Sequence, residues 1–162
     1  MLCSQHSQWE GTVIKVRAEL TIDRPADEIW SYAAEIARHP EWMSVMSAER
    51  LRGTGSQVGD RGRERMRMGP WASDAEFEVV AADPGRRITW RPGAGSPFTG
   101  DLTLELEPLG PEQTRATYGG SFRLRGVLRF VESLFAGEAK QGMAKELHRL
   151  KAAVEARPLT AS

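Results

Sequence analysis

Alternating polar and apolar positions across residues 61–82 predict a β-hairpin with one wet and one dry face. With Gly69-Pro70-Trp71-Ala72 as the turn, the charged residues pair across the wet face as Arg67 with Asp74, Arg65 with Glu76, and Arg63 with Glu78. Each opposite-charge pair contributes roughly 0.2–1 kcal/mol. The dry face, which includes Met66, Glu64 and Phe77, must be covered by another element.

The remaining pattern predicts a strand, two short helices, further strands and one long terminal helix. Pro25, Asp27 and Glu28 favour a helix N-terminus, because proline fits the first turn and acids complement the helix dipole. The helices are expected at 25–37, at 39–46 and, with a clear apolar stripe, at 127–157. The strands are expected at 12–22, 45–52, 60–69, 72–82, 86–91, 98–107 and 114–124.

This order of elements predicts an α+β domain with a helix on one sheet face. A sheet of about seven strands is much wider than one helix of about 10 Å diameter. We therefore expect the sheet to curl around the terminal helix, with the short helices closing one end. A small-molecule pocket is expected between them, although a well-filled core is the alternative.

Composition restricts the classes of partner. The 162 residues fit one domain, and we expect tails at 1–11 and 158–162 around a ligand-binding domain at 12–157. Lys plus Arg and Asp plus Glu both total 22, and this balance argues against binding to nucleic acid or to anionic membranes. No signal-peptide pattern and no run of about 20 apolar residues is found, so we expect a cytoplasmic protein without a membrane span.

The organisation of the chain resembles a known superfamily. The first strand, the helix start Pro25-Ala26-Asp27-Glu28-Ile29-Trp30, the Pro40-Glu41-Trp42 element and the closing helix resemble the START-like helix-grip proteins. Within them, the polyketide cyclase/dehydrase-like group, related to the Bet v 1 allergens, is most similar. The resemblance covers roughly residues 12–156. It implies a curved antiparallel sheet wrapped around the C-terminal helix, and a hydrophobic pocket that holds lipids, polyketides or other apolar molecules.

The inward phase of the strands and helices predicts the walls of this pocket. Methionine and aromatic side chains dominate it and adapt to irregular apolar ligands. The predicted ligand-binding residues are Trp42, Met43, Met46, Met66, Met68, Phe77, Trp90, Leu102, Leu104, Phe122, Phe130 and Leu134. For each of them an ordinary core position is the alternative, and Trp42 is either a gate or simple packing of its element.

Glu64 and Tyr118 are the candidate catalytic residues. The hairpin places Glu64 inward between two outward arginines, and a carboxylate in an apolar pocket has a raised pKa that suits proton transfer. Tyr118, also inward, can donate its phenolic hydrogen to a ligand carbonyl or to Glu64, so the two can act as base and acid. The alternative for Glu64 is a place at the open end of the strand, in water or paired with an arginine.

Other kinds of chemistry lack a recognisable pattern. The single cysteine, Cys3, and the dispersed His6, His39 and His148 have no metal-ligand spacing. His39 lies near the expected pocket opening and is interpreted as flanking the break between the short helices. No Gly-x-Ser-x-Gly elbow or phosphate loop occurs, and we expect no cofactor and no metal.

Three functional hypotheses follow. The first is a protein that binds an apolar small molecule in an internal cavity, as a monomer or homodimer. The second is a cyclase or dehydratase that uses Glu64 and Tyr118. The third is a non-catalytic interaction domain, which uses the sheet edge or Trp71 and has a packed interior.

Overall fold

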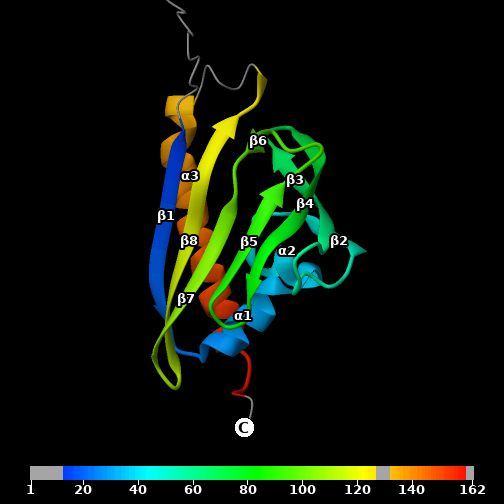
Figure 1. Cartoon of the computed structure of the whole chain (residues 1–162). Coiled ribbons are helices and arrows are strands. Elements are labelled where there is room, and N and C mark those ends of the chain that lie inside the picture. Colours follow the sequence, from blue (N-terminus) through cyan, green and yellow to red (C-terminus); the bar gives the residue numbers. More distant parts are fainter. Residues whose placement is uncertain (1–12, 127–131, 160–162) are drawn as a thin grey trace, which may run out of the picture.

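The computed structural model describes residues 13–126 and 132–159, without the side chains of Met68 and residues 132–135. An antiparallel sheet curves around a long C-terminal helix, α3 (Glu132–Glu155), which runs along the inner face behind β1, β8 and β7 (Figure 1). The strand order is β1-β8-β7-β5-β4-β3-β2, and β6 pairs with β8 off this path. The strands are β1 (Ile14–Ile22), β2 (Ser47–Arg52), β3 (Arg61–Met68), β4 (Trp71–Asp83), β5 (Arg87–Pro92), β6 (Phe98–Thr99), β7 (Leu102–Gly110) and β8 (Gln113–Leu124). The predicted α+β helix-grip fold is confirmed.

The short helices lie between β1 and β2, as predicted, but end earlier. They are α1 (Ala26–Ala34), the 3-10 helix η1 (Ile36–Arg38) and α2 (His39–Trp42). Pro25 precedes α1, and Asp27 and Glu28 occupy its first turn. Glu35 is extended, with ψ of 111°, and its carboxylate accepts a hydrogen bond from the Ala37 N–H, which begins η1. Met43 is extended in turn, with ψ of 159°, so α2 stops well before Met46.

The β3–β4 hairpin has the predicted faces but not the predicted register. Met68 lies opposite Trp71, and the wet-face pairs are Arg65 with Asp74, Arg63 with Glu76, and Arg61 with Glu78. The turn is therefore only Gly69-Pro70, since Gly69 takes the positive φ of 62° that a two-residue hairpin turn needs. The observed pairing of β3 with β4 is thus shifted by two residues from the predicted pairing. Because strand side chains alternate with a period of two, no side chain changes face.

The strand predicted at 98–107 is divided at Gly100. Its φ is 122°, and a Cβ there would overlap the backbone of Ser121. Only glycine combines this conformation with such a close approach. The chain consequently leaves β6, which pairs with the end of β8, and starts β7 as a neighbour of both β8 and β5.

The core fills one end of the molecule and not the other. In the C-terminal half of α3, Leu147, Leu150 and Val154 are buried against the sheet and α1. Hydrogen bonds also hold this end of α3 against the rest of the fold. Arg24 Nη2 donates to the carbonyl of Glu155 over 2.6 Å, and Lys151 Nζ donates to the carbonyl of Thr21 over 2.9 Å. The preceding turns of α3 carry mostly small or polar residues over 136–142. These cannot fill the space between helix and sheet.

Candidate functional site

A pocket of about 590 Å³ lies between the inner face of the sheet and the N-terminal half of α3. We call it the interior pocket. Its volume lies within the range of about 300–1,000 Å³ that is common for small-molecule sites. One wall comes from strands β3, β4, β5, β7 and β8, and another comes from α3. Residues of α2 and of the segment after it close one end of the pocket.

Six of the twelve predicted ligand-binding residues lie on the wall of the interior pocket, namely Met43, Met66, Phe77, Trp90, Leu102 and Phe122. Glu64 and Tyr118 also lie on this wall. The hairpin and the β7–β8 ladder bring these residues to one face, because the inward side chains of neighbouring strands align in an antiparallel sheet.

Three predicted lining residues lie elsewhere. Trp42 is fully buried beneath the wall, where its ring packs on Trp90 and Tyr118 at centroid distances of 6.1 and 5.4 Å. Leu104 is fully buried in the core. Met46 is 50% exposed, because the early end of α2 places it at the sheet edge beside β3. Phe130 and the side chains of Met68 and Leu134 lie outside the described part of the chain.

Glu64 is paired with a histidine rather than with an arginine. Its Oε1 lies 2.6 Å from Nδ1 of His39, the first residue of α2. The His39 ring is fully buried and packs against Phe77 and Trp90, with centroids 5.5 and 5.7 Å away. Arg63 and Arg65 alternate to the opposite face, so neither can reach Glu64.

Tyr118 donates its hydroxyl hydrogen to Glu146 of α3, not to Glu64. The Tyr118 Oη to Glu146 Oε2 distance is 2.9 Å, and the backbone N–H of Ser44 donates to Oε1 of the same carboxylate over 2.8 Å. Three elements far apart in the sequence thus meet at one carboxyl group. The arrangement joins β8, the segment after α2, and α3 beside the interior pocket.

Burial sets the protonation of this pair. Burial raises the pKa of Tyr118 well above its ordinary value, and the negative charges of Glu146 and Glu64 raise it further. The hydroxyl therefore stays protonated at neutral pH. Burial also raises the pKa of Glu146, and the hydrogen bonds from Ser44 and Tyr118 offset only part of this effect.

Sequence reasoning missed His39 and Glu146 as members of the site. Glu146 carries a usable signal, since it lies three residues after Met143 and four before Leu150, on the apolar stripe of the helix. A carboxyl group in such a stripe points to a polar site inside the fold. His39 carries no comparable signal, because its partner Glu64 lies 25 residues further along the chain.

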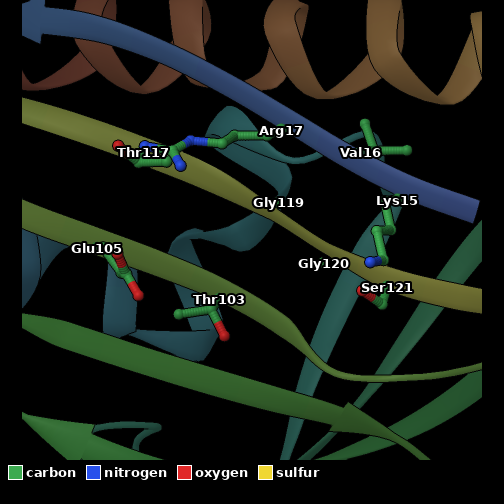
Figure 2. A pocket seen from close by; sticks show the side chains of 9 residues that line it. All are labelled: Lys15, Val16, Arg17, Thr103, Glu105, Thr117, Gly119, Gly120 and Ser121. Carbon is green, nitrogen blue, oxygen red and sulfur yellow. The ribbon is translucent and has the colours of Figure 1, made fainter.

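A second hollow, of about 320 Å³, lies on the outer face of the sheet (Figure 2). It lies over β1, β8 and β7, where Gly119 and Gly120 present no side chains. Lys15, Arg17 and Glu105 surround it with charges of both signs, and all three are exposed. Such an open, mixed-charge hollow lacks the enclosed apolar walls of the interior pocket, which is therefore the candidate site.

The described ranges contain neither a metal-binding cluster nor a membrane-spanning helix. There, no group of three or more His, Cys, Asp or Glu side chains has an arrangement that can hold a metal ion. No helix in those ranges combines the length and the apolar character needed to cross a membrane.

The curved sheet, the C-terminal helix and the pocket between them define a protein of the helix-grip class. More narrowly, residues 13–155 match the model of the family described as polyketide cyclase/dehydrase and lipid transport, and the chain belongs to that family. The search of curated proteins gave no match.

Solved structures with the same fold have low sequence identity. The Zhui aromatase/cyclase from Streptomyces sp. R1128 is 16% identical, with a TM-score of 0.74 over 89% of this chain and 94% of that one. A START superfamily protein from Mycobacterium smegmatis is 20% identical, with a TM-score of 0.69 over 87% and 97%. Ara h 8.0201 is 13% identical, with a TM-score of 0.68 over 90% and 100%. At these identities the likeness concerns the fold.

Proposed function

We propose that the protein binds an apolar small molecule in the interior pocket. One observation carries the proposal, namely a pocket of about 590 Å³ whose lining surface is mostly apolar and includes methionine and aromatic side chains. Burying apolar ligand surface there gains roughly 25 cal/mol per Å². The description of the family as including lipid transport supports the same function.

Two helical glycines allow a matched test. Gly142 lies on the pocket wall, whereas Gly137 lies one and a half turns earlier on α3 and outside the wall. A Cβ at either position meets no atom within 4 Å, so both sites accept a larger side chain. Gly142→Phe fills pocket volume, and Gly137→Phe makes the same chemical change outside it.

The assay is titration with N-phenyl-1-naphthylamine, a neutral probe whose fluorescence rises in apolar surroundings. Wild type and Gly137→Phe are expected to bind it saturably with equal Kd, and Gly142→Phe at least about tenfold more weakly, which corresponds to 1.4 kcal/mol. Absence of saturable binding by the wild type contradicts the proposal. Equal Kd for wild type and Gly142→Phe contradicts it as well.

A second candidate function is cyclisation with loss of water from a polyketide-like substrate. The specific observation in its favour is that Glu64 and Tyr118 lie on one pocket wall, each with a hydrogen-bond partner. In this hypothesis the Glu64 carboxylate removes a proton from the carbon beside a carbonyl, and the resulting enolate attacks a second carbonyl of the same chain. The Tyr118 hydroxyl protonates the new alkoxide. The tyrosinate then takes the second proton from the same carbon, and the proton held by Glu64 goes to the departing hydroxyl, so that water leaves and both residues return to their starting forms.

A poly-β-ketone thioester tests this second function, with product detected by mass spectrometry as the loss of water. Glu64→Gln is expected to lower turnover about 100-fold or more, in line with a general base. Glu49→Gln, on the exposed face of β2, serves as the control. Unchanged turnover in Glu64→Gln, or no product from wild type, removes this hypothesis. The interaction-domain alternative requires a packed interior, and the pocket volume argues against it.

A further inference from the structure

We infer that the interior pocket selects an apolar ligand whose polar end donates hydrogen bonds, an alcohol, phenol or amine, and discriminates against a carboxylate. This inference rests on the proposed binding function and concerns the chemistry of the ligand's head group. The hydrogen-bond donors on the pocket wall are already satisfied or out of reach, whereas several acceptors are not.

The charges on the wall are mainly negative. The acidic residues that line it are Glu64, Glu76, Glu138 and Glu146, and the Glu76 side chain alternates to the outer face of the hairpin. Glu76 is neutralised from outside, because Arg61 and Arg63 donate to it over 2.9 and 3.0 Å. Among the described residues, Arg67 is the one arginine or lysine on the wall, and it is exposed near the hairpin turn.

The charge of Glu146 has no basic partner in the described ranges. Its two hydrogen bonds come from the Tyr118 hydroxyl and the Ser44 N–H, and both donors are neutral. Glu64 lies close enough for its charge to act on both Tyr118 and Glu146. A third negative charge, brought in by a ligand beside these two carboxylates, would be repelled by both of them.

The side-chain atoms on this wall that can still form hydrogen bonds with a ligand are acceptors, on Glu64 and Tyr118. Glu64 uses Oε1 for His39, and its Oε2 accepts from no residue that the structure describes. A carboxylate has about four lone-pair sites, and the Tyr118 oxygen keeps lone pairs after it donates to Glu146. A ligand hydroxyl or ammonium group satisfies these acceptors, whereas a ligand carboxylate cannot.

The donors on the wall are already engaged or out of reach. The Nδ1 of His39 is taken by Glu64, and the hydroxyl of Ser96 is taken by the carbonyl of Phe98 over 2.9 Å. The indole Nε1 of Trp90 and the Nε2 of His39 have no partner in the described structure, but both atoms are buried and offer no donor to the pocket. Apart from the exposed Arg67 near the hairpin turn, the described wall therefore has surplus acceptors and no surplus side-chain donors to hold a carboxylate.

Decan-1-ol, decylamine and decanoate provide a test, because they share one chain and differ in the head group. Each compound is titrated at neutral pH against protein loaded with N-phenyl-1-naphthylamine, and the midpoints of the displacement curves give relative Kd values. We expect decan-1-ol and decylamine to bind at least about tenfold tighter than decanoate. In Glu64→Gln this preference should fall about threefold or more, because a negative charge is lost and an amide donor is gained. Glu49→Gln, on the outer face, should keep it.

The outcomes separate the two proposals. If the probe does not bind wild type saturably, the binding function fails and the inference fails with it. If the probe binds but decanoate displaces it as well as the other two, only the head-group inference fails. Displacement by none of the three also overturns the inference. The wild-type ranking stands as a test even if Glu64→Gln does not fold.

Discussion

The hydrogen bond between Tyr118 and Glu146 can be measured as a coupling free energy. Tyr118→Phe removes only the hydroxyl, since the ring and its packing on Trp42 are kept. Glu146→Gln removes the charge and keeps the shape of the side chain. The double variant completes a double-mutant cycle, in which effects on each residue alone cancel.

The expected magnitude follows from burial and charge. Tyr118 is 1% exposed, and its acceptor is a carboxylate that water reaches poorly. A hydrogen bond to a charged group is worth about 1.5–3 kcal/mol, more than one between neutral groups. We therefore expect a coupling of about 1.5–3 kcal/mol at neutral pH, measured by urea unfolding of the four proteins.

The pH dependence gives a second measure of the same site. Burial raises the pKa of Glu146 in the folded protein, so between its ordinary value of 4.5 and the raised value the folded state binds more protons than the unfolded state. Stability then falls as pH rises through this window. Wild type should lose stability relative to Glu146→Gln from about pH 4.5 upward. A coupling below about 0.5 kcal/mol, or an opposite pH slope, would refute the account of this pair.

Three further predictions concern stability and can be checked by urea unfolding. Gly119→Ala should destabilise the protein by about 1–3 kcal/mol because its Cβ would overlap the Val16 carbonyl oxygen, whereas Gly110→Ala, with open space, should not; equal effects would contradict the close approach of β1 and β8. Leu147→Ala should cost about 2–5 kcal/mol, since this side chain is 1% exposed in the packed half of α3, and a loss below about 1 kcal/mol would argue against that packing. Trp71→Ser should change stability by less than about 0.5 kcal/mol, because Trp71 is 74% exposed; a larger loss would mean that the hairpin tip is covered.

The faces of the elements were predictable from the sequence because they depend on local periodicity. The alternation in β3 and β4 identified Glu64 and Phe77 as inward and the arginines as outward, and the structure has these faces. The apolar stripe at Leu147, Leu150 and Val154 predicted the inner side of α3. Such patterns repeat every two or 3.6 residues and need no knowledge of distant parts.

The register of the hairpin was less predictable, because it depends on the backbone of two residues. The sequence Gly69-Pro70-Trp71-Ala72 is compatible with a turn of four or of two residues. The positive φ of Gly69 selects the two-residue turn. Each cross-strand pair is therefore shifted by two positions from the register predicted for a four-residue turn. Likewise, the break at Gly100 depends on its approach to β8, which no local pattern reveals.

The sequence alone determined which hairpin residues face inward, the order of the main elements along the chain and that the terminal helix is too slender to cover the whole sheet. Only the tertiary structure decided which polar groups meet inside. His39 and Glu64 are 25 residues apart, and Tyr118 and Glu146 are 28 apart. The physical reason is that such contacts follow from the three-dimensional path of the chain. Periodicity assigns a side chain to a face, but only the packing of α2, β8 and α3 brings its partner to it.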